Sequence, residues 1–238
     1  MIGTITRRSV LARKARFIII GLAILLGVAF VSGSFILADS LRSTFDSLFS
    51  DITKDVDLEV RSSQAFDGGV QATRDPVPVS LVDTVAAIDG VEKVEPSLSR
   101  YAQLIDSDGK VVATQGAPTL GVSWSGPGGL SGVTLRDGSV PDGPAQVAVD
   151  EATADRAGFE IGDTVSVITD TGTHQFELVG LVGLGDSKGF AGATVAAFDN
   201  ATAQDVLDSQ GFVDTIDIGV ADGADPTQVQ AAIAAALP

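Results

Sequence analysis

The stretch LRDGSVPDGPAQVAVDEATADRAGFEIGDTVSV, residues 135–167, contains the local signals that decide the fold. Apolar alternation around Val147 predicts a strand, and Asp150 directly after it can N-cap a short helix. Gly158 stands where a left-handed residue ends such a helix, and the Gly-Asp pair at 162–163 predicts a turn into the next strand. Strand, short helix and strand in such close succession indicate a mixed α+β fold.

Strand signals continue on both sides of this stretch. Downstream, alternation predicts a hairpin that starts at Val165 and Val167, turns at 170–172 and returns through Phe176 and Leu178.

Upstream, residues 101–116 predict another hairpin, which turns at Asp108 and Gly109. The Gly-rich segment 121–132 reads as a loop and holds the only tryptophan. Together these segments predict a β-rich insert at about residues 115–195.

Strand-and-helix units flank the insert. Residues 56–60 predict a strand, and Ser80 and Gly90 bracket a helix as its N-cap and its C′ residue. Residues 91–106 then return as strand, which completes a β-α-β unit. The apolar face of this helix consists of Leu81, Val85 and Ile88.

The end of the chain predicts a similar unit. A short helix at 201–210 is bracketed by Asp199 or Asn200 and by Gly211, and an alternating strand follows at 212–220. A last helix opens with Asp225 as N-cap and its apolar face consists of Val229, Ile233 and Leu237.

No return strand follows this last helix, so we expect the natural polypeptide to continue past residue 238.

The N-terminal part predicts a membrane anchor. Residues 17–38 run for 22 residues without a charge. A helix of that length measures about 33 Å, enough to cross a hydrocarbon core of about 30 Å. Five basic residues and no acidic one lie in segment 1–16, which the positive-inside rule places in the cytoplasm. The alternative is a cleavable signal peptide, but the apolar run is longer than the ~7–15 residues of such peptides and no A-x-A-like site follows.

A stalk follows the anchor at residues 39–55. Apolar side chains recur there at helical spacing and predict an amphipathic helix, whose stripe faces either a second helix or the domain itself. Within the anchor, small residues spaced four apart either allow close packing against another membrane helix or occur by chance: Ala23 with Gly27, and Ala29 with Gly33.

The chain after the anchor, residues 39–238, is strongly acidic. Of 15 basic residues five precede the anchor, which leaves 15 − 5 = 10 against 31 acidic ones. Such a surface repels phosphate backbones, so the sequence argues against nucleic acid as a partner. The chain has no cysteine and therefore no disulfide or thiolate chemistry.

The order of these elements resembles the N-terminal half of FtsX-like, or MacB-like, ABC transporter permeases. In that family a Gly and Pro loop leads to an alternating strand, a short helix with a Gly, and Gly-Asp before a Val-rich strand. The residues that match this pattern are Gly138, Pro144, Val147, Val149, Asp150, Gly158, Gly162, Asp163 and Val165.

The resemblance implies an extracytoplasmic, MacB-like periplasmic core domain after the first membrane helix. This domain would consist of a porter-like α+β subdomain split in sequence and a small β-rich subdomain. It also implies a cytoplasmic ABC ATPase subunit as a partner, a second permease copy or paralogue, contact with membrane lipid, and three further membrane helices beyond residue 238.

The motifs that could carry chemistry are weak. No P-loop is present, and residues 183–189 only faintly resemble one, so we expect an ordinary strand connection there. A single histidine, His174, cannot form a usual zinc site without cysteines. Asp106 and Asp108 match half of a calcium loop, which a hairpin turn explains as well. The Asn-Ala-Thr triplet at 200–202 matters only in a host that glycosylates exported chains.

We therefore predict no catalytic, cofactor-binding or metal-binding residue, and leave the substrate-binding residues unassigned. The main hypothesis is a non-enzymatic permease component that couples ATP hydrolysis by a partner to export, extraction or signalling at the outer face of the cell membrane. The alternatives are a stand-alone, signal-anchored binding module and an anchored hydrolase.

Overall fold

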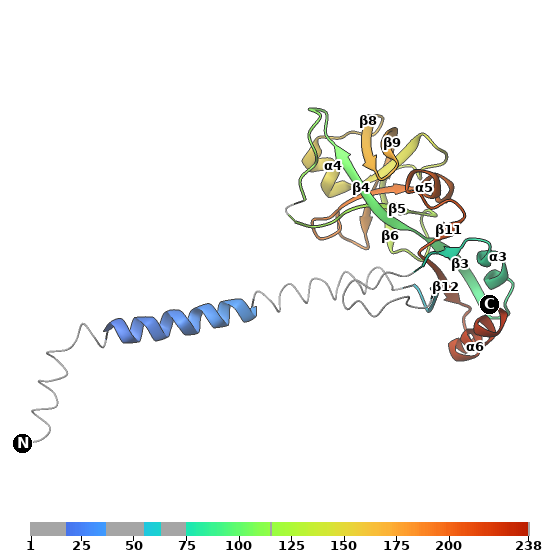
Figure 1. Ribbon diagram of the computed structural model, residues 1–238, viewed down its shortest axis with the longest axis horizontal. Helices are drawn as coiled ribbons and strands as arrows, with labels where there is room; N and C mark the ends of the chain where they lie inside the picture. Colours follow the sequence, from blue (N-terminus) through green and yellow to red (C-terminus); the bar gives the residue numbers. More distant parts are fainter. Residues whose placement is uncertain (1–17, 37–54, 63–74, 115, 238) are drawn as a thin grey trace, which may run out of the picture. The chain divides into compact units, whose positions relative to one another are not determined.

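The computed structural model describes residues 18–36, 55–62, 75–114 and 116–237, in two compact units. The first unit contributes one described element, a helix from Ile18 to Ile36 that is long and apolar enough to span a membrane. Its large apolar side chains are exposed, as expected for a helix that faces lipid. Residues 39–54, most of the predicted stalk, lie outside the described residues. All other described elements belong to the second unit, the outer domain (Figure 1).

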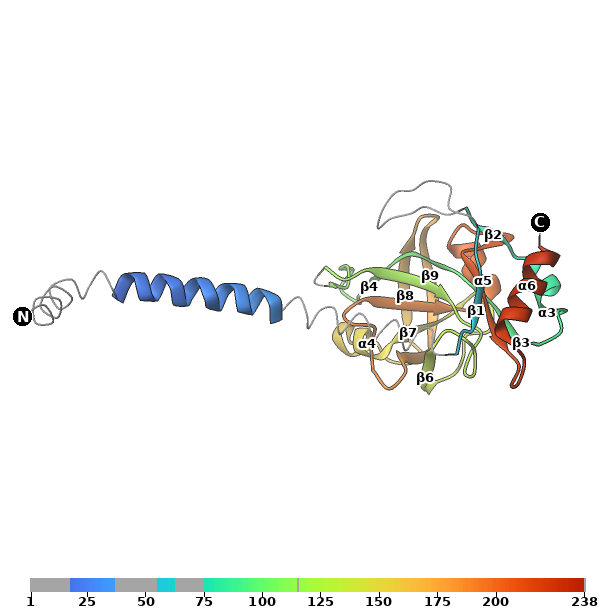
Figure 2. The ribbon, with the colours of Figure 1, turned by 90° about the horizontal axis from the view of Figure 1, so that it is seen from below.

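A three-stranded sheet joins segments from both ends of the outer domain. Its order is β1 (Leu58–Val60), β12 (Thr215–Val220) and β3 (Val91–Ser97), with β12 antiparallel to both neighbours. Helices α3 (Leu81–Ala86) and α6 (Pro226–Ala236) lie next to each other close to this sheet (Figure 2). The core formed by these elements includes Val85, Ile216, Ile218, Val229 and Ile233.

The ends of α3 differ from the prediction. Ser80 has helical backbone angles, φ −60° and ψ −16°, and its side chain makes no cap hydrogen bond, because an N-cap requires extended backbone. The helix ends at Ala86, ahead of Gly90. Gly90 instead has φ +89°, and a Cβ there would lie 2.8 Å from a methyl carbon of Val229. The glycine therefore allows α6 to approach the turn that leads into β3.

Helix α6 follows the prediction closely. The Asp225 side chain accepts a hydrogen bond of 2.9 Å from the Thr227 backbone N–H, and Pro226 occupies the first turn. Val229 and Ile233 are buried, as the apolar face predicted.

A seven-stranded sheet forms the larger part of the domain. Its order is β6-β9-β7-β10-β5-β4-β8, and β9 also pairs with β8, so six of the strands close into a ring. The strands are β4 (Ser99–Ile105), β5 (Thr119–Ser123), β6 (Val133–Gly138), β7 (Gln146–Asp150), β8 (Thr164–Thr169), β9 (Gly172–Leu184) and β10 (Thr194–Phe198). Apolar side chains fill its interior, among them Leu104, Val147, Val165, Leu178 and Phe198. We call this element the barrel.

Two short helices and a two-stranded ladder complete the domain. Helix α4 (Glu151–Ala157) follows β7, and α5 (Asn200–Val206) follows β10; β2 (Val77–Pro78) pairs with β11 (Phe212–Val213). Both predicted caps of α4 are confirmed, since Asp150 accepts from the Thr153 N–H and Gly158 is left-handed at φ +71°. Helix α5 begins after Asp199 as predicted, but it ends at Val206, several residues ahead of Gly211.

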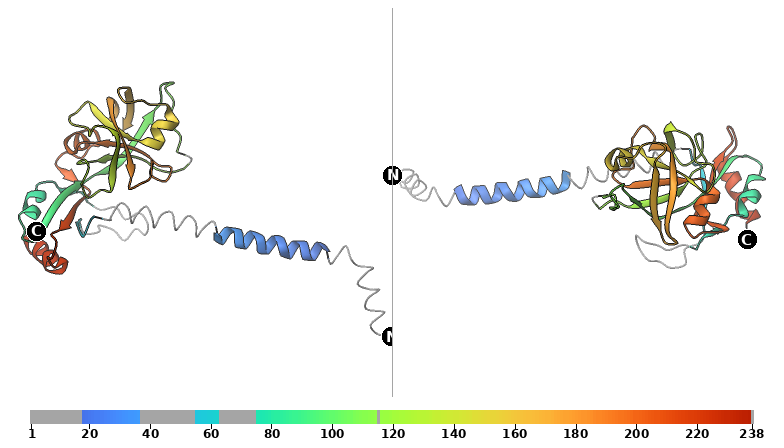
Figure 3. Two further views of the ribbon diagram at one scale, coloured as in Figure 1. Left: turned by 180° about the vertical axis from the view of Figure 1, so that it is seen from behind. Right: turned by 90° about the horizontal axis from the view of Figure 1, so that it is seen from above.

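One predicted strand is two. Residues 91–106 form β3 in the small sheet and β4 in the barrel, joined at Leu98, so that a single extended segment links the two sheets (Figures 1 and 3). Leu98 is buried, and its N–H donates to the Ser123 hydroxyl, 2.9 Å away, in place of a ladder partner. The predicted turn after β4 is present, although its return arm makes only one bridge, Ile105 with Val111.

Candidate functional site

The P-loop-like residues 183–189 form a strand end and a turn, as predicted. Leu184 closes β9, and the Lys188 ammonium lies 2.5 Å from Glu151 and 3.6 Å from Asp155. The hydrogen bond that Lys188 donates to Glu151 raises the pKa of Lys188. Because the Lys188 ammonium already forms ion pairs with two carboxylates, the segment is not arranged to bind phosphate.

The other weak motifs also have structural roles. His174 places Nε2 2.8 Å from the Thr171 hydroxyl and stacks near Phe176. Asp106 accepts two backbone hydrogen bonds within its turn. Asn200 begins α5 and donates to the Ser125 hydroxyl at 3.1 Å. Within the part of the chain that the structure describes, no group of three or more His, Asp or Glu side chains is arranged to hold a metal ion.

The structure instead brings together a cavity that the sequence did not predict. It measures about 320 Å³ and its lining residues come from both the three-stranded sheet and the barrel. Apolar side chains dominate its surface, which is typical of ligand pockets. They include Val56, Leu98, Leu120, Val122, Val133 and Phe190.

Polar groups enter the cavity mainly from the small sheet. Glu59 on β1 and Asp217 on β12 line it, and they are paired directly across the two strands. Glu95 on β3 is the next residue in the same row, opposite Asp217 on its other side. Residues directly opposite in antiparallel strands share a face, so three carboxylates stand side by side on one face of the sheet. We call them the carboxylate row.

The Glu95 carboxylate already has hydrogen-bond partners within the chain. It is only 6% exposed and accepts hydrogen bonds from the backbone N–H groups of Ser125, at 3.3 Å, and Leu130. A Cβ at Gly129 would lie 2.8 Å from a Glu95 oxygen, which explains the glycine in this loop. Glu95 therefore orders the Gly-rich loop after Trp124.

Asp217, in the middle of the row, has hydroxyl groups as its hydrogen-bond partners. The Thr215 hydroxyl donates to Oδ1 at 3.0 Å. Burial raises the pKa of Asp217 to about 6; the charges of Glu59 and Glu95 add to this rise, and the Thr215 and Ser97 hydroxyls oppose it. No basic residue appears among the described residues that line the cavity. The Arg61 guanidinium lies 3.8 Å from Glu59, and both side chains are well exposed.

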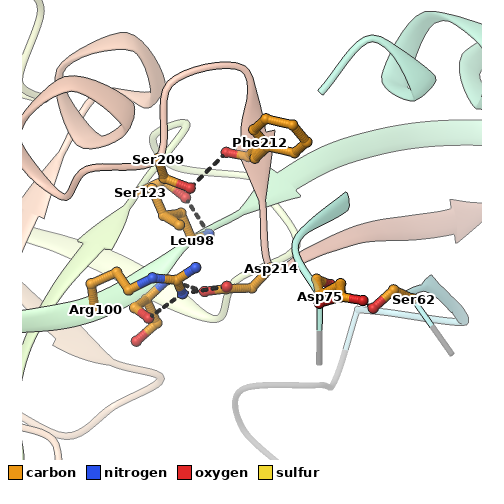
Figure 4. A network of polar contacts seen from close by, with 9 residues as sticks. Ser62, Asp75, Leu98, Arg100, Ser123, Ser209, Phe212 and Asp214 are labelled. Atoms are coloured by element: carbon orange, nitrogen blue, oxygen red, sulfur yellow. Dashed lines mark hydrogen bonds and ion pairs between the residues drawn. The ribbon is translucent and has the colours of Figure 1, made fainter. Parts of the chain in front are cut away.

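A network of polar contacts connects the small sheet with the barrel beside the cavity (Figure 4). Asp214, just before β12, pairs with the Arg100 guanidinium on β4 and accepts from the Ser99 N–H at 2.9 Å. The Ser123 hydroxyl on β5 accepts from the Leu98 N–H and donates to the Pro96 carbonyl at 3.2 Å. These contacts hold the two walls of the cavity in register.

Sequence reasoning missed the carboxylate row for a clear reason. Glu59 and Asp217 alternate with apolar residues, a pattern that normally marks a solvent-facing strand face. Nothing in the local pattern shows that the barrel covers part of that face. Each of the three strands carries an acidic residue, and this could have indicated the row. The three residues can be placed opposite one another only when the strand register is known.

Comparisons with known proteins identify the family. The model of the MacB-like periplasmic core domain matches residues 17–236. The periplasmic region of MacB from Actinobacillus actinomycetemcomitans has a similar fold, with a TM-score of 0.57 at 14% identity, over 77% of this chain and 82% of that one. The extracellular domain of the noncanonical ABC-type transporter YknZ from Gram-positive bacteria aligns with a TM-score of 0.49 at 12% identity, over 74% and 88%.

No curated protein matches the sequence. The family match nevertheless extends over most of the chain, and it confirms the resemblance that the strand, helix and turn pattern of residues 135–167 indicated. The chain belongs to the MacB-like periplasmic core domain family.

Proposed function

We propose that this chain acts as a permease component of an ABC transporter, in which the outer domain couples ATP hydrolysis by a separate cytoplasmic subunit to export, extraction or signalling. The observation that carries the proposal is a MacB-like periplasmic core domain preceded by one helix that can span a membrane. Residues 1–238 contain no P-loop sequence, which supports placing ATP hydrolysis on a separate subunit.

The apolar helix and the domain family together indicate a membrane-anchored protein with an extracytoplasmic domain. The finer topology belongs to the proposal: a cytoplasmic segment at 1–16, a membrane helix at 17–38, a stalk at 39–55 and the outer domain at 56–238. The basic N-terminal segment and the acidic outer domain support this orientation.

The proposal also treats the small sheet with α3 and α6 as a porter-like subdomain, and the barrel as the β-rich subdomain, which contains the predicted insert of about residues 115–195 and also β4. Separate hydrophobic cores support this division. Movement of one subdomain against the other would transmit a change at the membrane helix to the outer face. The partners would be the ATPase subunit, a second permease copy or paralogue, and membrane lipid.

Copurification tests the proposal directly. The chain, expressed in its own host and extracted in mild detergent, should copurify with an ATP-binding subunit in a fixed ratio. The ATPase rate of that complex should change when the outer domain is deleted. Isolation of the chain without any ATP-binding protein would contradict the proposal.

The cavity favours a second function, a signal-anchored binding module that works without an ATPase. In that case deletion of the outer domain would abolish ligand binding, and no nucleotide-dependent change would occur.

A further inference from the structure

We propose that the cavity between the small sheet and the barrel binds a small organic cation with an apolar body, held by the carboxylates of Glu59 and Asp217. This inference goes beyond the proposed transporter function and does not depend on an ATPase partner. The proposal rests on the volume of the cavity, its apolar wall and its two carboxylates.

The size and lining of the cavity suit a small amphiphilic molecule. A volume of about 320 Å³ lies at the lower end of the range of ligand pockets, which is roughly 300–1,000 Å³. The barrel contributes an apolar wall that includes Leu120, Val122 and Val195. Burial of an apolar group there removes both the ligand and these side chains from water.

The charge of the cavity selects a cation. Two neighbouring carboxylates face one space with no basic side chain among the described lining residues, and like charges directly opposite on adjacent strands destabilise the sheet. A bound ammonium group would relieve this repulsion and form charge-assisted hydrogen bonds. An anion would increase the repulsion.

The titration of Asp217 gives the proposal a pH signature. Its raised pKa, about 6, is that of the free domain, and the carboxylates that face it are Glu59 and Glu95. A cation stabilises the ionised form, so binding should release a proton near pH 6 and weaken at lower pH.

The test uses the full chain in lipid nanodiscs and three probes of one shape: phenethylammonium, 2-phenylethanol and 3-phenylpropionate. Binding is measured by calorimetry, with empty nanodiscs as the blank for lipid partition. Emission from Trp124 is a second readout, because this residue packs in a cluster that includes the cavity residues Val122, Val133 and Phe190. We expect the cation to bind at least tenfold more tightly than the alcohol, and the carboxylate not to bind.

Asp217→Asn should remove most of this preference while leaving the alcohol's affinity unchanged. The matched control is Asp170→Asn, which makes the same change of charge at an exposed turn of the barrel. Lowering the pH from 7.5 to 5 should weaken binding of the cation roughly tenfold in the wild type, as expected for protonation of a group with a pKa of about 6. The variant should show a much smaller change.

Equal affinity for the three probes, or a cation preference that survives Asp217→Asn, would overturn the proposal. If Asp217→Asn does not fold, Glu59→Gln at the exposed side of the row and the wild-type pH profile decide the question. A short lysine-containing peptide that binds where phenethylammonium does not would also overturn it and assign the cavity to a protein partner.

Discussion

Burial raises the pKa of an aspartate in both the barrel and the small sheet, but the two carboxylates have different hydrogen-bond partners. In the barrel, Asp150 is completely buried, but its two oxygens accept hydrogen bonds from the backbone N–H groups of Thr153 and Val195. In the small sheet, Asp217 is half-buried beside two other carboxylates and receives hydroxyl hydrogen bonds without a cation. The first arrangement stabilises a closed structure, whereas the second leaves unsatisfied charge at a cavity.

The difference follows from topology. Six barrel strands close into a ring around one core, so an inward charge there must be paired by the protein itself. The small sheet packs one face on its helices through Ile216 and Ile218, and alternation places Asp217 and Thr215 on its other face. That second face meets the barrel only in part. We therefore associate stability with the barrel and ligand chemistry with the small sheet.

The largest expected effect concerns the barrel core. Phe198 is fully buried and lies 5.0 Å from the ring of Phe176, measured between centroids. Phe198→Ala should lower the free energy of unfolding by about 3–5 kcal/mol. Val229→Ala in the small-sheet core should lower it by only roughly 1–2 kcal/mol. Thermal unfolding followed by Trp124 emission measures both, and equal losses would contradict the assignment of stability to the barrel.

The next effect separates the two capping aspartates. Asp150→Ala removes a helix cap and the hydrogen bond to Val195 inside the barrel, and should lower the free energy of unfolding by about 2–3 kcal/mol. Asp225→Ala removes an exposed cap of α6 and should lower it by about 1 kcal/mol. Denaturant unfolding at neutral pH measures both changes. A larger loss of stability for Asp225→Ala than for Asp150→Ala would contradict the expectation that the buried cap contributes more to stability than the exposed one.

A smaller effect, of opposite sign, is expected at Asp217. Its pKa is raised from 3.8 to about 6 in the folded chain, so its contribution to stability is present below pH 4 and is lost as the pH rises through 6. Asp217→Asn should therefore be more stable than the wild type above pH 7, by about 1–2 kcal/mol after allowance for its partial exposure. Unfolding of both proteins from pH 4 to pH 8 gives the difference curve. A flat difference would show that Asp217 has an ordinary pKa.

The smallest effects distinguish two serines that line the cavity. Ser123 bonds to both Leu98 and Pro96, so Ser123→Ala should destabilise the domain by about 1 kcal/mol. Ser131 has an unpaired buried hydroxyl, so Ser131→Ala should leave stability unchanged or raise it by up to about 1 kcal/mol in the absence of ligand. The melting temperature should fall for Ser123→Ala and should stay the same or rise for Ser131→Ala. A loss at Ser131 would show that its hydroxyl already has a partner.

Much of the fold could be predicted because its signals are local. The caps of α4 and α6, the hairpin of β8 and β9 and the anchor depend on residues close together in the sequence. The predictions that were wrong concern residues whose conformation depends on contacts with a distant segment. Gly90 serves the approach of Val229 rather than ending α3, and Leu98 divides one extended segment between two sheets because it is buried in the barrel core.

The candidate site could not be predicted from the same signals. Glu59, Glu95 and Asp217 lie far apart in the sequence, and each looks like an ordinary solvent-facing position in its own strand. Strand register places them in one row, and among the described residues the barrel and the loop before β6 cover part of that row.

The sequence by itself therefore determined the apolar anchor, the acidic outer domain, the mixed α+β class and most helix caps. These depend on composition and on hydrogen bonds between residues a few positions apart. The tertiary structure alone decided how the strands are divided between two sheets, how the barrel closes and where the cavity forms. Burial at that cavity raises the pKa of Asp217. These depend on contacts between distant segments and on exclusion of water, neither of which a local pattern contains.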